Sequence, residues 1–196
     1  MGLALDTATS TVGVDNFIRR VEQHFVIPEQ CTKLLEHSIA LEQECHEKLR
    51  AGDLCMLPSF IAALPKGHER GFLLALDVGG SNFRVALIKL SGLSPGIPSA
   101  SIVCRQDHII TRAERALKGQ SFFDWMADKI KCTLQSHGQP LPNPLHAGVS
   151  WSFPIRQTST RNAVLLPMGK NFKASEGLLG EDLLDLIMNA CTKQVS

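Results

Sequence analysis

Apolar residues recur at helical spacing in two segments near the N-terminus. The first segment carries one apolar stripe, made of Phe17, Ile18, Val21 and Phe25. Asp15 precedes this stripe and is placed to cap a helix there. The second segment can start in a first turn at Pro28, and its helical period continues through residues 31–49 until Gly52 stops it. The pattern predicts two helices, of which the second has a charged outer face.

The pattern changes after residue 54. Residues 56–71 contain two prolines and two glycines without a lasting period, which indicates an irregular connector. The run 72–78 is almost wholly apolar, as in a strand buried on both faces, and the alternating run 83–90 follows it. Between them the pair Gly79–Gly80 is expected to supply the positive φ angles of a tight reversal. The sequence therefore predicts a β-hairpin.

The rest of the chain alternates strands and helices. A third strand is expected over 101–111, then a helix that ends near Gly138, with Ser121 and Asp124 spaced as a capping box. The apolar stripe of that helix is Phe122, Trp125, Met126, Ile130 and Leu134. Strands at 145–153 and 162–166 follow.

The last predicted helix begins after Glu181 and Asp182, whose charges suit its N-terminal dipole. Its apolar residues are Leu179, Leu183, Leu186, Ile187 and Ala190. The predicted order is two helices, three strands, a helix, two strands and a helix. This order is typical of a mixed α/β fold.

Composition and charge exclude several classes of protein. The 196 residues are 44% hydrophobic, so the chain is expected to fold around a core. The net charge of +1 argues against charge-driven binding to nucleic acid or to an anionic membrane. No N-terminal signal peptide pattern occurs, and the uncharged run 54–64 is too short to insert into a membrane. Six scattered cysteines without a C-x-x-C motif favour a reduced, cytoplasmic protein.

The bend of the hairpin contains the most specific candidate for a ligand-binding motif. Asp77 closes an apolar strand, and two glycines, Ser81, Asn82 and Arg84 follow it closely. Glycines let a backbone approach a phosphate, exposed N–H groups form an anion-binding nest, and a carboxylate can hold a hydrated Mg²⁺. The alternative is a plain two-glycine hairpin whose turn Asp77 ties down. The sequence is neither a Walker A loop nor a Rossmann G-x-G-x-x-G motif.

Two further segments could bind a ligand. The first, residues 150–157, is a strand end that breaks at Pro154 and carries Ser152 and Phe153. The second, residues 168–172, is a flexible loop that presents Lys170. A structural turn and a solvated lysine are the alternatives. The seven histidines show no metal-binding spacing.

Together these segments resemble the hexokinase family over roughly residue 14 to the end of the chain. LALDVGGSNFRVALIKL resembles the first phosphate loop of that family, and WSFPIRQTS followed by VLLPMGKNF resembles its sugar-binding stretch. MLPSFIAALPKG and KASEGLLGEDLLDLI resemble the family at matching positions. The resemblance implies an actin-like, ribonuclease H-like fold in two lobes. Residues 1–55 would be N-terminal helices of the large lobe, and residues 56–196 the small lobe.

The resemblance also implies roles for individual residues. Those that would line ATP and its Mg²⁺ are Asp77, Gly79, Gly80, Ser81, Asn82 and Arg84. Ser152, Phe153 and Gly169 would lie against a hexose. Lys170 would reach the sugar hydroxyls and assist phosphoryl transfer, where a positive charge stabilises the transition state. The implied activity is an ATP-dependent hexose kinase.

Two residues of the lysine loop depart from the family pattern. The family has Thr where this chain has Gly169, and Trp where it has Met168. Losing one hydroxyl from a sugar site costs about 0.5–1.5 kcal/mol and opens space. These departures suggest a sugar with a larger substituent, such as N-acetylglucosamine, beside glucose.

The resemblance places the catalytic aspartate, the last small-lobe strand and most of the nucleotide site after residue 196. We therefore expect this chain by itself to lack measurable kinase activity. The strand at 145–153 would be an unpaired edge, and the apolar faces of the first two helices would lack a partner. The alternatives are a non-catalytic hexokinase-like regulator that binds a sugar or a protein partner, and a partial sequence of a longer kinase.

Overall fold

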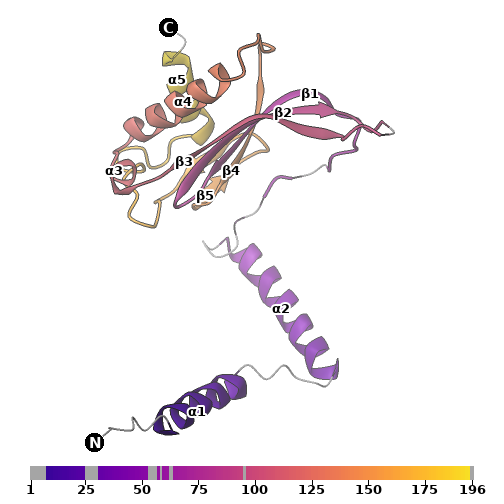
Figure 1. Cartoon of the computed structure of the whole chain (residues 1–196), viewed down its shortest axis with the longest axis vertical. Coiled ribbons are helices and arrows are strands. Elements are labelled where there is room, and N and C mark those ends of the chain that lie inside the picture. The colour runs from indigo at the N-terminus through magenta and orange to yellow at the C-terminus, as the bar shows by residue number, and fades with distance from the viewer. Residues whose placement is uncertain are drawn as a thin grey trace, which may run out of the picture. The chain divides into compact units, whose positions relative to one another are not determined.

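The computed structural model describes residues 8–24, 31–52, 57, 59–61, 64–94 and 96–194 (Figure 1). The chain divides into two units, residues 1–51 and 52–196, close to the boundary expected at residue 55. The assignment of these units to two lobes stays a prediction. Pro28, Phe25 and residue 54 lie outside the described residues.

The first unit holds two helices, α1 (Ala8–His24) and α2 (Cys31–Ala51). Both were predicted, but Asp15 lies inside α1 and does not cap it, since the apolar stripe continues back to Val14. Their apolar side chains are exposed within this unit: Phe17 is 67% exposed and Leu35 is 62% exposed. Propensity and backbone hydrogen bonds therefore support these helices, and buried side chains contribute little.

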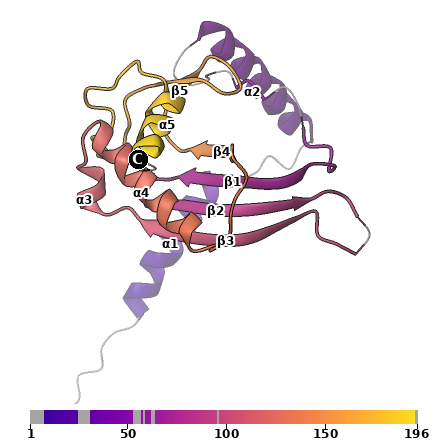
Figure 2. The ribbon, with the colours of Figure 1, turned by 90° about the horizontal axis from the view of Figure 1, so that it is seen from above.

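The second unit is built on a four-stranded mixed sheet (Figure 2). Its strands are β1 (Arg70–Val78), β2 (Asn82–Ser91), β3 (Ala100–Ile109) and β4 (His146–Trp151), in the order β3-β2-β1-β4. The first three form an antiparallel meander, and β4 joins β1 in parallel. The predicted hairpin and third strand are confirmed. Within the described sheet β4 is an edge, as predicted.

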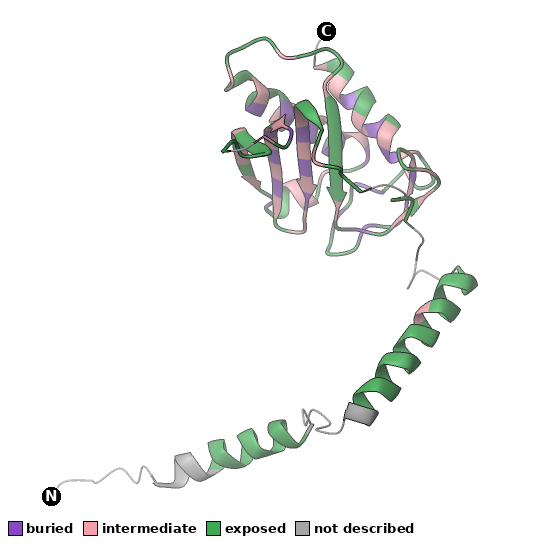
Figure 3. Cartoon of the chain, turned by 90° about the vertical axis from the view of Figure 1, so that its right-hand side faces the viewer, coloured by how far each residue is buried: buried purple, intermediate pink, exposed green. Residues whose placement is uncertain are grey.

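One face of the sheet carries the hydrophobic core. Along β1 the buried residues Leu74, Leu76 and Val78 alternate with half-buried ones, so the expectation of burial on both faces was wrong (Figure 3). Helices α4 (Gln120–Gln135) and α5 (Leu183–Lys193) contact one another, and α4 also contacts β2 and β3. On the opposite face of the sheet, side chains such as those of Asp77 and Arg84 stay half-exposed.

The helix caps only partly follow the sequence pattern. No side chain caps α4, which begins after Gly119 at a φ of 50°, so the capping box expected at Ser121 does not form. A capping box forms instead at the start of the short helix α3 (Arg112–Arg115), between the N-cap residue Thr111 and Glu114. The hydrogen bond from Thr111 lowers the pKa of Glu114. The spacing of Thr111 and Glu114 would have predicted this helix.

The start of α5 is capped by Asp182, which the sequence had marked only for its charge at the N-terminal dipole. One carboxylate oxygen accepts the N–H of Leu184 at 2.8 Å, and the other accepts the N–H of Ala163 at 3.2 Å. The second bond ties α5 to a small hairpin of β5 (Ile155–Gln157) and β6 (Ala163–Leu165). β6 was predicted, and β5 is too short to leave a period in the sequence.

Candidate functional site

The turn between β1 and β2 contains the two glycines. The N–H of Gly79 donates to the carbonyl of Asn82 at 2.9 Å. Neither glycine has a positive φ, so that expectation was wrong. Space is the reason for glycine instead: a Cβ on Gly80 would lie 3.0 Å from Cδ of Lys170, and one on Gly79 would lie 3.2 Å from the Asn82 carbonyl oxygen. The turn therefore needs glycine for close approach.

Ser152 and Phe153 follow the end of β4 and lie beside this turn. The N–H of Ser152 donates to the carbonyl of Val78 at 3.0 Å, which fixes the segment to the last residue of β1. Ser152 is exposed, whereas Phe153 is buried. The ring of Phe153 lies 4.7 Å from that of Phe172, centroid to centroid. One residue of the pair thus faces solvent while the next anchors it.

The loop that carries Lys170 is anchored from both sides. The N–H of Met168 donates to the buried hydroxyl of Ser175 at 3.3 Å, and the N–H of Phe172 donates to the Gly169 carbonyl at 3.2 Å. Between these bonds Lys170 and Asn171 take left-handed φ angles of 58° and 63°. Two consecutive strained residues persist only where the surroundings impose them, and such strain gathers at functional sites.

Lys170 joins the three segments that the sequence singled out. Its ammonium lies 5.3 Å from the centroid of the Phe153 ring, and its stem passes against Gly80. A cation over an aromatic face is attracted by the ring quadrupole. The fold therefore brings the glycine turn, residues 152–153 and residues 169–170 to one place.

An aromatic cluster beneath this place was not predicted as a unit. Phe172 packs edge-on against Phe122 of α4, and Trp151 stacks on Phe123. In the sequence, the helical periodicity predicted that Phe122 and Trp125 are buried. For Phe172 there was only a weak indication, an aromatic residue directly after a polar loop. The cluster ties both candidate ligand segments to α4.

Asp77 and Arg84 face each other across β1 and β2, on the side of the sheet away from the core. The Arg84 guanidinium donates to Asp77 Oδ2 at 2.6 Å, and the two side chains are 43% and 38% exposed. Arg84, which was expected beside phosphates, is thus paired with the carboxylate expected to hold the metal. Arg84 Nε also lies 3.6 Å from Asp107, a residue that the sequence did not single out.

The residues present fit a metal–phosphate complex. The side chains give a partly exposed carboxylate at Asp77 and an ammonium at Lys170, near a turn whose glycines have close neighbours. A backbone hydrogen bond fixes Ser81, whose carbonyl accepts the N–H of Ile110 at 2.8 Å. Within the described residues no group of three or more His, Cys, Asp or Glu could hold a metal ion. A cation here would need phosphate oxygens or water as further ligands.

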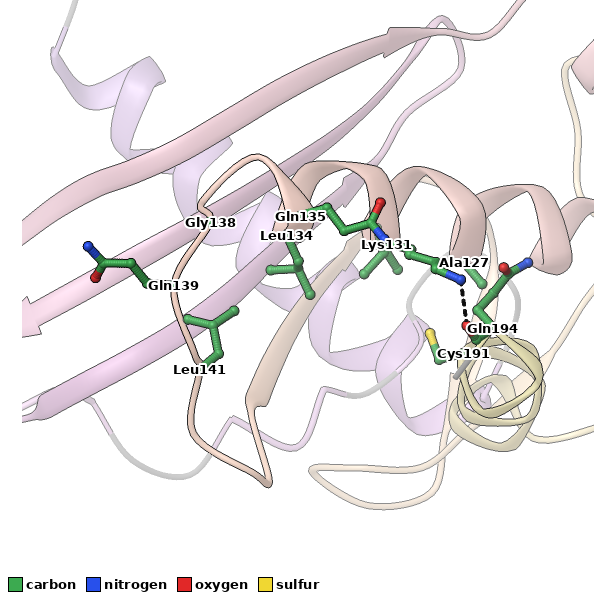
Figure 4. A pocket seen from close by; sticks show the side chains of 10 residues that line it. Ala127, Lys131, Leu134, Gln135, Gly138, Gln139, Leu141, Cys191 and Gln194 are labelled. Carbon is green, nitrogen blue, oxygen red and sulfur yellow. Dashed lines mark hydrogen bonds between the residues drawn. The ribbon is translucent and has the colours of Figure 1, made fainter. Parts of the chain in front are cut away.

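Two hollows lie among the described residues of the second unit. One, of about 590 Å³, lies between the ends of α4 and α5 and is lined by Leu134, Leu141 and Cys191 among others (Figure 4). Burial raises the pKa of the Cys191 thiol. The other, of about 520 Å³, lies on the open face of the sheet and includes Asp77 and Arg84. Only the second adjoins the candidate site.

Comparisons with known proteins identify the family of this chain. A family model described as Hexokinase matches residues 17–196. Human hexokinase-3 is 37% identical over 147 residues, which cover 74% of this chain and 15% of that protein. Rice hexokinase-2 is 29% identical over 188 residues, covering 92% of this chain and 37% of that protein.

A solved structure supports the fold. A hexokinase from Schistosoma mansoni complexed with glucose matches with a TM-score of 0.59 and 28% identity, over 71% of this chain and 30% of that one. The fold is a mixed α/β domain that matches part of a hexokinase structure. The chain belongs to the hexokinase family. It spans between 15% and 37% of the length of the two relatives compared here. No helix among its described residues is long and apolar enough to cross a membrane.

The close approach at Gly80 gives a testable prediction. In Gly80→Ala the new methyl group should push the Lys170 stem aside and move the ε-methylene protons away from the Phe153 ring. Protons above an aromatic face resonate upfield, so NMR should show this shift reduced. Gly148→Ala, where a Cβ meets nothing within 4 Å, is the matched control. An unchanged Lys170 resonance in Gly80→Ala would contradict the contact.

Proposed function

We propose that this chain contributes the phosphate turn and the sugar segment of an ATP-dependent hexose kinase. The observation that carries the proposal is the position of Lys170, whose stem lies against Gly80 while its ammonium lies over Phe153. A sugar hydroxyl at residues 152–153 and a phosphoryl group at the turn would both be within the reach of one cation. Family membership supports the same reaction.

The roles follow from the chemistry of each side chain. Exposed Ser152 would hydrogen-bond a hydroxyl of the sugar, and Phe153, whose side chain is buried, would hold this segment in place against the sugar. Gly79 and Gly80 would let phosphates approach the backbone, with Ser81 and Asn82 as additional donors. Lys170 would orient the sugar and stabilise negative charge on the transferring group.

Asp77 would hold Mg²⁺ through water molecules beside the phosphates. The bound ion would neutralise charge that develops on the phosphoryl oxygens. Without the ion, Arg84 donates to that carboxylate at 2.6 Å. The residues of this chain would therefore bind and position both substrates, and positioning carries most of the catalysis in phosphoryl transfer.

Sugar binding can be tested on the chain itself. The sequence has two tryptophans, so Trp125→Phe leaves Trp151 as the reporter, 5.6 Å from the Phe153 ring. We expect saturable fluorescence changes with glucose or N-acetylglucosamine. Ser152→Ala should weaken binding roughly 2- to 12-fold through the loss of one hydrogen bond. An equal response to acyclic sorbitol would contradict a hexose site. Sugar binding without turnover by the whole protein would favour the non-catalytic regulator.

Gly169 gives a second prediction, about specificity. A Cβ there would meet nothing within 4 Å, so a larger residue fits. Gly169→Thr should tighten glucose binding roughly 2- to 12-fold by adding one hydrogen bond. It should also disfavour N-acetylglucosamine, because the side chain fills the open space beside the sugar. Gly169→Val, of similar volume but without a hydroxyl, is the control. A strong glucose preference in the parent protein, measured as kcat/KM, would count against the modified specificity.

A further inference from the structure

Four charged residues lie together on the open face of the sheet. Asp77 lies opposite Arg84 in the β1–β2 register, and Arg84 lies opposite Asp107 in the β2–β3 register. Arg105 lies two residues before Asp107 on the same strand. We call Asp77, Arg84, Asp107 and Arg105 the charge row. It borders the hollow of about 520 Å³ on this face.

Within the charge row Arg84 lies between two carboxylates. Its Nη1 is 2.6 Å from Asp77 Oδ2, and its Nε is 3.6 Å from Asp107 Oδ2. Both contacts involve half-exposed side chains, so the guanidinium can turn from one carboxylate to the other without opening the core. Arg84 therefore has a first partner and a second one within reach.

Arg105 keeps Asp107 in place and charged. It donates two hydrogen bonds to the Asp107 carboxylate, both at 2.7 Å. These bonds lower the pKa of Asp107. They also compete with Arg84 for the same carboxylate, since Arg84 Nε approaches an oxygen that Arg105 already holds. Asp107 is thus an anionic acceptor whose attraction for Arg84 is moderated by Arg105.

A divalent cation at Asp77 must compete with the Arg84 guanidinium for the same carboxylate. Leaving the carboxylate costs Arg84 less if a second carboxylate can receive it. We propose that Asp107 is a positioning residue that receives the guanidinium of Arg84 when a divalent cation binds at Asp77. This inference rests on the proposed function, because it takes Asp77 as the carboxylate that holds the metal.

The proposal predicts opposite effects of two exposed substitutions. Asp107→Asn removes the second carboxylate, so Arg84 should stay on Asp77 and cation binding should weaken by roughly two- to fivefold, the range that exposed ion pairs reach. Arg105→Gln frees Asp107 for Arg84, so cation binding should strengthen within a similar range. Because the two variants act in opposite directions, general destabilisation of the chain cannot produce both results.

A direct charge effect on the cation would have the same signs, so a coupled variant is needed. In an Arg84→Gln background, Asp107→Asn should no longer change cation binding, because no guanidinium remains to be received. Asp124→Asn, which removes a carboxylate that pairs with Lys193 on α4 and α5, is the matched control for net charge. It should leave cation binding unchanged.

The probe is Mn²⁺ bound to the β,γ-imido analogue of ATP, titrated with the chain and followed by water-proton relaxation. A second readout is the ¹⁵Nε resonance of Arg84, which should shift when Mg²⁺ and the same analogue are added, and should not shift in Asp107→Asn. An equal effect of Asp107→Asn with and without Arg84 overturns the inference alone. Binding of the complex that Asp77→Asn leaves unchanged contradicts the proposed function as well.

Discussion

The packing of α4 on one face of the sheet is the constraint on which the second unit depends. Phe122, Phe123 and Met126 of the helix are buried against a sheet whose residues Phe83 and Val85 are also buried. Aromatic and large aliphatic side chains contribute most of the area removed from water in a domain of this size. Because the helix covers one face only, Asp77 of β1 and Arg84 of β2 stay half-exposed on the other face.

That same helix also fixes the candidate site. Phe172 packs on Phe122, and Phe153 packs on Phe172, so the lysine loop and the end of β4 meet through a single aromatic stack. The anchored ring then holds a strained backbone at Lys170 and Asn171. Core packing thus supplies the rigidity that a site on two loops would otherwise lack.

The sequence predicted the hairpin, β3, α4, β6 and α5 because each has a strong period or a clear cap. It could not predict the close approach at Gly80, since the neighbouring side chain is that of Lys170, about 90 positions later in the chain. The failed capping box at Ser121 has a local cause, because Gly119 starts the helix earlier. Residues 152–153 and 169–170 were identified by family resemblance, and their meeting depends on the packing of Phe153 and Phe172, which no local pattern reports.

The placement of the charged residues on the open face follows from the core on the other face. Side chains alternate along a strand, so burying Val78, Phe83 and Val85 turns Asp77 and Arg84 to the opposite face. A shift of one residue in register would send those charges into the core, at a cost of several kcal/mol for each unpaired ion. The core therefore selects the register, and the register in turn sets Asp77, Arg84 and Asp107 side by side. The charged residues contribute little to stability, and the core residues, which contribute most of it, determine their positions.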